Sequence, residues 1–221
     1  MTLLNDRIIM HNMVKMISKV AARYAPSRIL SYDPAHVLKS LQLASQSDKI
    51  SRTLLQEELD LGEGSIKTLV KHLKMQDLVE TSNAGMWMTA KGRNLYKKIS
   101  ETISAEMDLS KCSVTLGKFN HAILVKDMGD EVTTGIEQRD AAIKVGATGA
   151  TTLIFQDGKF LMPDRKQDSL RKDIKLKENI IESLQPQEND VIIIASSENR
   201  KNADIAAKSA ALYTISKHER H

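Results

Sequence analysis

Apolar side chains recur at helical spacing along most of the first half of the chain. Near its start they predict one amphipathic helix over residues 1–24, which Pro26 would end. Its apolar face consists of Met10, Met13, Val14, Ile17, Val20 and Ala21. We expect this face to pack against a partner subunit or the next domain, because a lone helix would leave it in water. The alternatives are a flexible leader and a start codon that has been assigned too far upstream.

A second helical series begins at Asp33, which can cap a helix whose first turn holds Pro34. Ser51 caps the next helix, the glycine pair of 62–64 forms a turn, and Ser65 can cap a third helix. In order, the predicted elements are a helix from Pro34, helices over 51–59 and from Ser65, strands over 79–81 and 86–88, and a helix over 93–103. This order is that of a winged helix-turn-helix.

Beyond residues 107–112 the pattern changes to alternating strands and helices. In order, we predict a strand over 119–126, a helix over 135–145, strands over 150–155 and 160–162, a helix over 169–184, a strand over 191–195 and a helix over 202–215. Asp157 and Gly158 predict a hairpin, and the continuous apolar run 191–195 predicts a central strand. This order matches a ferredoxin-like sandwich, with a small α/β sandwich on an open sheet as the alternative. The whole chain is therefore predicted to be α+β.

The change of pattern also divides the chain into domains. We expect an N-terminal helix or extension over 1–30, a winged helix over 31–106, an α/β sensor or dimerisation domain over 113–216, and a tail over 217–221. The net charge of +4 is uneven: residues 1–106 carry 15 Lys and Arg against 11 Asp and Glu, and the rest carry 17 of each. This asymmetry favours a polyanionic partner for the first domain, with chance as the alternative.

The third helix of the winged helix has one apolar and one basic side. In a helix-turn-helix this helix enters the major groove, where lysines bind phosphates and hydroxyl groups donate to phosphates or bases. The predicted DNA-binding residues are Ser65, Lys67, Thr68, Lys71, His72 and Lys74, with Lys91 and Arg93 beyond the hairpin. The helix contains no arginine, so it cannot supply bidentate reading of guanine by arginine. A merely solvated basic face is the alternative.

Two polar stretches of the second domain are candidate ligand sites. The first lies in a short helix and contains Gln138, Arg139, Asp140 and Lys144. An arginine beside free helix amides suits a carboxylate or phosphate, whereas Thr134 and Glu137 predict a capping box. The second follows the buried strand and contains Ser197, Asn199 and Arg200. A small anionic metabolite is the ligand that these residues would suit, and ordinary helix capping is the alternative.

Several classes of chemistry have no support in the sequence. The six histidines are isolated, and neither GxxxxGK[ST] nor GxGxxG occurs, so we expect no catalytic residues, no cofactor and no metal site. Cys112 is the only cysteine, which rules out an internal disulfide and fits a reducing compartment. No segment has the length and apolarity of a membrane span, and no signal-peptide pattern is present. We therefore expect a cytoplasmic protein.

Two segments resemble an archaeal family of transcription regulators that join a winged helix to a C-terminal domain of unknown function. The segments are LGEGSIKTLVKHLK in the first domain and the more specific GIEQRDAAIKVGATGATTL in the second. The resemblance spans about residues 34–215 and leaves the first helix outside it. It implies transcription regulation and assigns no ligand and no site residues.

The favoured hypothesis is a homodimeric transcription regulator that binds double-stranded DNA through its winged helix. Its second domain would dimerise and sense a small anionic metabolite. One alternative is an enzyme or a nucleotide- or metabolite-binding protein with an appended winged helix. The other is a scaffold whose winged helix binds protein.

Overall fold

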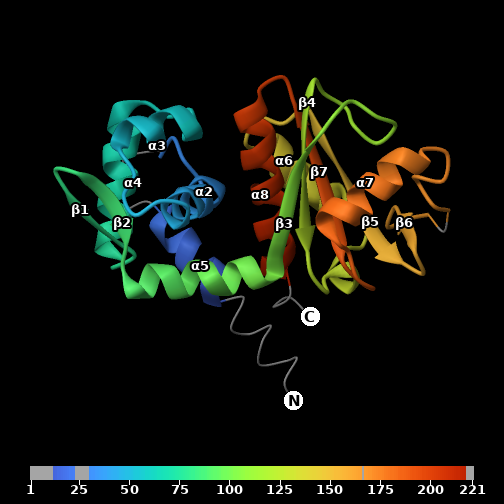
Figure 1. Ribbon diagram of the computed structural model, residues 1–221, viewed down its shortest axis with the longest axis horizontal. Helices are drawn as coiled ribbons and strands as arrows, with labels where there is room; N and C mark the ends of the chain where they lie inside the picture. Colours follow the sequence, from blue (N-terminus) through green and yellow to red (C-terminus); the bar gives the residue numbers. More distant parts are fainter. Residues whose placement is uncertain (1–11, 23–29, 166, 218–221) are drawn as a thin grey trace, which may run out of the picture. The chain divides into compact units, whose positions relative to one another are not determined.

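The computed structural model describes residues 12–22, 30–165 and 167–217. The chain divides into two compact units, residues 1–99 and 100–221, which are described separately (Figure 1). The predicted helix over 1–24 can be followed only in its second half, where residues 12–20 are helical and residues 21 and 22 form a turn and a bend. The predicted stop at Pro26 and the tail from residue 218 lie outside the described residues.

The first unit has the predicted order of elements. It contains helices α2 (Pro34–Ser45), α3 (Arg52–Leu59) and α4 (Glu63–Met75), strands β1 (Val79–Ser82) and β2 (Gly85–Met88), and helix α5 (Ala90–Thr102), which runs on past the end of the unit. The Asp33 carboxylate accepts a hydrogen bond from the amide of Ala35 at 2.8 Å, which caps α2. The Ser51 hydroxyl accepts from the amide of Leu54 at 3.0 Å, which caps α3. Both predicted caps are confirmed.

The hairpin of β1 and β2 is tied to the segment before α3. Ile50 and Met86 exchange two backbone hydrogen bonds of 2.9 Å, so residue 50 acts as a third, one-residue strand of the wing. Gly85 has φ +133°, and a Cβ there would lie 2.7 Å from the Ile50 carbonyl oxygen. Only glycine allows the wing to approach this segment so closely.

One local prediction in the first unit is wrong. The turn before α4 ends earlier than expected: Asp60 adopts a left-handed conformation, and Gly62 is the N-cap of α4 without a side-chain cap. Glu63, Gly64 and Ser65 therefore form the first turn of α4, and Ser65 does not cap it. The reason is that Asp60 already reverses the chain, so neither glycine is needed for the turn.

The N-terminal helix packs on the first unit. Val14, Ile17 and Val20 are buried, as the expectation that their face meets the next domain requires. The backbone carbonyl of Val20 lies 3.1 Å from Nδ1 of His72 in α4. The N-terminal helix is therefore one of the elements that support α4.

The second unit is a five-stranded antiparallel sheet between two layers of helices. Its strands are β3 (Ile103–Leu109), β4 (Phe119–Val125), β5 (Gly149–Gln156), β6 (Lys159–Leu161) and β7 (Val191–Ser197), in the order β3-β4-β7-β5-β6. Its α-helices are α6 (Ile136–Ile143), α7 (Ile174–Leu184) and α8 (Arg200–Ser216). α6 and α8 cover one face of the sheet, and α7 covers the other (Figure 1). The α+β class and the predicted central position of residues 191–195 are confirmed.

The strand order separates the two predicted topologies. Strands β4 and β5 run parallel to each other, with the antiparallel strand β7 between them. Strands β6 and β7 likewise run parallel, with the antiparallel strand β5 between them. Each of these is a split β-α-β arrangement. The two crossover helices, α6 and α7, lie on opposite faces of the sheet, which gives three layers. The small α/β sandwich describes this arrangement better than the two-layered ferredoxin-like fold.

One strand of the second unit was not predicted, and one helix begins later than expected. Strand β3 begins directly after α5 and pairs with β4 along its length, although residues 107–112 were expected to be an interdomain boundary. α7 begins at Ile174 rather than at residue 169, because the Asp173 carboxylate accepts from the amide of Leu176 and caps the helix there. No helix among the described residues has the length and apolarity needed to cross a bilayer.

Candidate nucleic-acid interface

The buried apolar side chains and the exposed charged side chains of α4 occupy different faces of the helix. Ile66, Leu69, Val70 and Leu73 are buried in the first unit. Glu63, Lys67, Lys71 and Lys74 recur at i, i+4, i+8 and i+11, which places them on one face of the helix. All four are exposed, and we name them the α4 ridge. The ridge is therefore one row of an acid followed by three lysines.

The ridge residues have different partners. The Lys67 ammonium lies 2.7 Å from the Glu63 carboxylate, and both side chains are more than half exposed. A glutamate is already ionised at neutral pH, and the hydrogen bond from Lys67 lowers the pKa of Glu63 further. Lys74 donates to the Thr81 hydroxyl at 3.1 Å, which ties α4 to the wing. Lys67 and Lys71 are the ridge lysines best placed to meet a phosphate.

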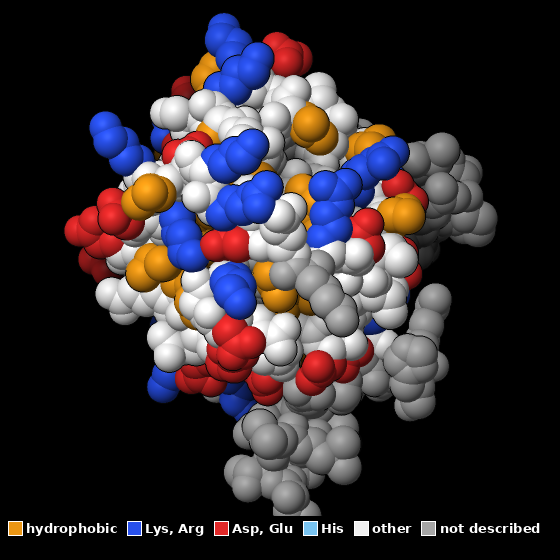
Figure 2. All heavy atoms as spheres, turned by 90° about the vertical axis from the view of Figure 1, so that its right-hand side faces the viewer, with side chains coloured by type: hydrophobic (Ala, Val, Ile, Leu, Met, Phe, Trp, Pro, Cys, Tyr) orange, Lys and Arg blue, Asp and Glu red, His pale blue; other side chains and the backbone are white. Residues whose placement is uncertain are grey.

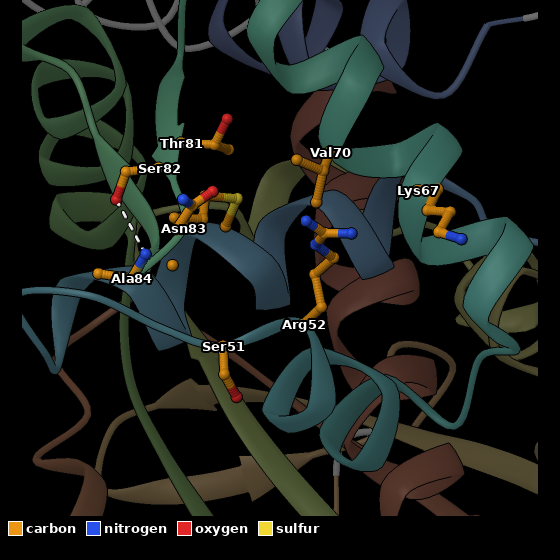
Figure 3. Close-up of a pocket in the computed structure, with 10 residues that line it drawn as sticks. Ser51, Arg52, Lys67, Val70, Thr81, Ser82, Asn83 and Ala84 are labelled. Atoms are coloured by element: carbon orange, nitrogen blue, oxygen red, sulfur yellow. Dashed lines mark hydrogen bonds between the residues drawn. The ribbon is translucent and has the colours of Figure 1, made fainter.

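A groove runs between α4, the start of α3 and the wing. It has a volume of about 210 Å³, and its lining consists of Ser51, Arg52, Lys67, Val70 and residues 81–86 (Figure 3). Arg52 extends from the start of α3 towards Val70 of α4. At the tip of the wing, the amide of Ala84 donates to the Ser82 hydroxyl at 3.1 Å, beside Asn83. Two cations and several polar groups of the hairpin therefore line one concave surface.

Lys91 ties α5 to the end of α4, and Arg93 ties α5 to the wing. Lys91 donates to the Gln76 carbonyl, at the end of α4, over 2.8 Å, and Arg93 donates to the Met88 carbonyl over 2.6 Å. Both side chains belong to exposed residues, so each can still contribute positive potential to a surface. Their hydrogen bonds give them a structural role that the sequence prediction did not include.

Ser65, Thr68 and His72 are the predicted contacts that the structure supports least. The Thr68 hydroxyl is bound to the Gly64 carbonyl at 2.9 Å, and Ser65 and Thr68 are half-buried. His72 is only 6% exposed. Its Nδ1 lies 2.6 Å from the Tyr32 hydroxyl. The prediction that His72 meets DNA is therefore corrected: the side chain points into the unit.

The burial of His72 has an electrostatic consequence. Burial, helped by the positive charge of Lys71, lowers the pKa of His72. The hydrogen bond with the Val20 carbonyl opposes this shift without reversing it. The histidine is therefore kept neutral at physiological pH and adds no charge to the ridge.

Sequence reasoning did not single out Arg52 or Glu63. Arg52 follows the N-cap Ser51 directly, and cations are not the usual residues for the first turn of a helix. That departure is the signal that could have identified it. Glu63 was assigned to the turn, which hid its place at the head of the α4 ridge. An arginine is thus available beside α4, although α4 itself contains none.

The side chains of the first predicted ligand site of the second unit do not point to one common position. Arg139, Asp140 and Lys144 are exposed on α6, but Gln138 points inward, is fully buried and donates to the Thr214 hydroxyl at 3.2 Å. The predicted capping box is absent, because Gly135 is the N-cap of α6 and makes no side-chain cap, and Glu137 pairs with Lys217 instead. That hydrogen bond lowers the pKa of Glu137.

The second predicted ligand site is used by the fold itself. Ser197 is buried and donates to the Gly146 carbonyl at 3.3 Å, and Asn199 caps α8 through the amide of Lys201. Arg200 is exposed and donates from Nε to the Asp108 carboxylate at 3.0 Å. The alternative of ordinary capping therefore describes Ser197 and Asn199.

The surface of the second unit has mixed charge where Figure 2 shows it. On this face Lys and Arg side chains are interspersed with Asp and Glu. The equal numbers of acids and bases in residues 107–221 agree with this picture. The α4 ridge and the groove, the features that favour a polyanion, both belong to the first unit.

A cluster of charged side chains lies between β3, β4 and α8. Nζ of Lys208 is 2.5 Å from the Glu106 carboxylate and also contacts the Asp204 carboxylate, with its side chain 2% exposed. His121 places Nδ1 at 2.8 Å from Asp108 and Nε2 at 3.5 Å from Glu106. Burial opposes ionisation of Glu106, but the adjacent His121 ring and the hydrogen-bonded Lys208 ammonium hold its pKa well below the usual range.

The charged cluster contains the one group of described residues suited to a metal ion: Glu106, His121 and Asp204, with ligand atoms within 4.8 Å of one another. The Lys208 ammonium contacts both carboxylates of that group. Because the ammonium already supplies the positive charge between these carboxylates, a divalent ion would have to displace it. The residues therefore fit an internal ion-pair network better than a metal centre.

Comparison with known proteins supports the division into two parts. Residues 35–103 match the family model described as CggR N-terminal DNA binding domain, and residues 116–215 match Domain of unknown function (DUF4443). The chain is also similar to a solved structure, "Hypothetical protein PH0730 from Pyrococcus horikoshii OT3". The two are 26% identical, with a TM-score of 0.67, over 86% of this chain and 96% of that one. No curated protein matches.

These matches confirm the coarser part of the expected resemblance. A domain of a DNA-binding type stands before a domain of unknown function, in the order that the sequence predicted. The similar structure extends the likeness of fold over both units. Beyond DNA binding, the three matches name no ligand, assembly or reaction.

Proposed function

We propose that this protein is a cytoplasmic transcription regulator that binds double-stranded DNA with its first unit. The observation that carries the proposal is the exposed row of Lys67, Lys71 and Lys74 on α4, in a unit that matches a DNA-binding domain family. The row lies on the helix that enters the major groove in a helix-turn-helix.

The geometry of the groove supports the same proposal. α4 presents Lys67 beside Arg52 of α3 and the polar tip of the wing, so three elements can meet one duplex. Lysine binds phosphate as a point charge, while arginine can bind a phosphate or a guanine edge with two parallel hydrogen bonds. We assign phosphate binding to Lys67 and Lys71, and we add Arg52 to the interface.

Reversing the charge of the ridge tests this proposal. Lys67→Glu/Lys71→Glu should weaken binding of a generic duplex by about tenfold or more, because two phosphate contacts become repulsions. The measurement is fluorescence anisotropy with the full chain. Lys172→Glu/Lys175→Glu is the matched control, since it makes the same charge change at exposed positions of the second unit. Equal affinities of the folded ridge variant and wild type would contradict the proposal.

We propose that the second unit forms a homodimer. α6 carries two exposed isoleucines seven residues apart, Ile136 at 55% and Ile143 at 41% exposure, which lie on one face of the helix. Large exposed apolar side chains that share a face are typical of protein interfaces. Ile136→Lys/Ile143→Lys should convert a dimer to a monomer in sedimentation velocity. A monomeric wild type, or a variant that remains dimeric, would contradict this part.

Ligand sensing is a further part of the proposed function. Arg139 and Lys144 offer exposed positive charge on α6, which suits an anionic metabolite. Such a ligand would regulate DNA binding only by preferring one dimer arrangement over another, because equal affinity for both shifts nothing. We propose binding rather than catalysis for this unit, since the carboxylates of Glu106 and Asp204 are engaged by the buried Lys208 ammonium.

A further inference from the structure

The single acidic residue of α4, Glu63, lies on the face of the helix that would meet DNA. Glu63 is the first residue of the helix, and its side chain is 66% exposed. It begins the α4 ridge, so it shares a face with Lys67, Lys71 and Lys74. A carboxylate on a surface that faces phosphates repels them, and therefore lowers affinity for every DNA sequence.

Two local effects favour a carboxylate here. A negative charge at a helix N-terminus interacts well with the helix dipole, and a Glu four residues before a Lys forms a favourable pair. The Glu63–Lys67 contact of 2.7 Å shows that the pair forms. Both effects act on helix stability alone, and neither predicts any preference among DNA sequences.

Base chemistry gives the carboxylate a second role. The residues at the start of a recognition helix are the ones that meet base edges in the major groove. An ionised carboxylate only accepts hydrogen bonds, so it can pair with the N4 amino group of cytosine and is repelled by the acceptors O6 and N7 of guanine. Glu63 is 66% exposed, and an exposed glutamate is ionised at neutral pH.

We infer that Glu63 is a specificity-determining residue that selects cytosine at one position of the bound duplex. The inference rests on the proposed function, because it needs α4 to lie in the major groove. Lys67 would keep the carboxylate oriented in the free protein, and on DNA its ammonium can reach a phosphate or a guanine edge. Lys67 would thus contribute affinity for DNA, and Glu63, its neighbour on the α4 ridge, would contribute selectivity.

The experiment selects duplexes from a randomised pool with the full chain and compares Glu63→Gln with wild type. Wild type should prefer cytosine at one position by about 5- to 150-fold, the range for one good base contact. Glu63→Gln should lose that preference or shift it to adenine, the base that an amide pairs with. Its affinity for a generic duplex should rise, because a repulsive charge is gone.

Two further variants separate the roles. Glu101→Gln removes the same charge from an exposed position near the far end of α5. This position lies 11 residues, or about 16 Å along the helix, from Ala90, where α5 begins after the wing, so the variant should leave the cytosine preference unchanged. Lys67→Gln should lower generic affinity while cytosine stays preferred. Circular dichroism checks that each variant retains its helices.

The outcomes distinguish this inference from the proposed function. Loss of the cytosine preference in Glu63→Gln alone supports the inference. Salt-sensitive DNA binding with an unchanged preference in Glu63→Gln, or with no base preference in wild type, overturns the inference and leaves the proposed function standing. Absence of DNA binding by wild type overturns both.

Discussion

At the scale of single residues, α4 shows why neighbouring side chains have different tasks. Lys71 and His72 are adjacent in sequence, yet Lys71 is exposed and His72 is buried against Tyr32 and Val20. The sequence shows α4 as a helix with one apolar side, and on that view position 72 is polar and open to solvent. A third element, the N-terminal helix, covers it in the fold. Long-range packing of this kind leaves no local signal in the sequence.

Replacing His72 tests this assignment. His72→Ala should lower the free energy of unfolding by about 1–3 kcal/mol, because it removes a buried hydrogen-bonding partner of Tyr32 and Val20. Lys71→Ala, the control, should change it by less than about 0.5 kcal/mol but weaken DNA binding. Urea unfolding and anisotropy measure the two effects. A stable His72→Ala protein with impaired DNA binding would restore the histidine to the interface.

The pH dependence of the same variant gives an independent check. The pKa of His72 is lowered by burial, so below the ordinary value of 6.5 the unfolded chain binds a proton that the folded chain resists. The stabilisation by His72 is therefore complete above pH 6.5 and declines as the pH falls. The stability difference between wild type and His72→Ala should narrow on acidification, unless the histidine is solvated.

At the scale of elements, strand β3 was the least predictable part of the fold. It alternates Ala105, Met107 and Leu109, which contact the apolar core on the α7 side, with Glu106 and Asp108, which meet α8. This is a period-two pattern, but the helical pattern of α5 runs directly into it without a turn. The acidic alternate positions look solvent-facing until Lys208 and Arg200 of α8 supply their partners. The capped and well-spaced elements α2, α3, β5 and β6 were predicted because their signals are local.

Removing Lys208 tests how β3 is held. Lys208→Met should destabilise the second unit by about 3–5 kcal/mol, because it leaves the Glu106 and Asp204 carboxylates without their cation. The double variant Glu106→Gln/Lys208→Met should recover part of that loss, since both partners of one buried pair are removed. Thermal unfolding compares the three proteins. Equal stability of Lys208→Met and wild type would show that the cluster does not hold β3.

The same cluster should make the wild type sensitive to acid. Despite burial, His121 and Lys208 lower the pKa of Glu106, and His121 and Arg200 lower that of Asp108. A lowered folded-state pKa gives stability that is complete above the ordinary value of 4.5 for glutamate and is lost as the pH falls further. Lys208→Met should lose less stability than wild type does as the pH falls below 4.5, because without the ammonium the folded-state pKa of Glu106 is no longer held so far below its value in the unfolded chain. The stability difference between the two proteins should therefore narrow on acidification.

At the scale of the whole molecule, the chain joins two units with different charge. The excess of Lys and Arg in residues 1–106 was visible in the sequence, and so was the order of elements in both halves apart from strand β3. The sequence could not show whether the candidate ligand sites of the second half are available to a ligand. Ser197 makes a buried hydrogen bond and Asn199 caps a helix, so both polar side chains are used by the fold. Composition can indicate which half meets a polyanion, but only packing shows which polar side chains remain available.

The most direct test of the central claim is the salt dependence of DNA binding by the wild-type chain. We expect log affinity for a generic duplex to fall linearly with log salt, with a slope near −0.9 for each phosphate neutralised. Lys67→Glu/Lys71→Glu should reduce the magnitude of that slope by about 2, because two of those contacts come from the α4 ridge. Weak binding that does not respond to salt, or a slope that the variant leaves unchanged, would contradict the account.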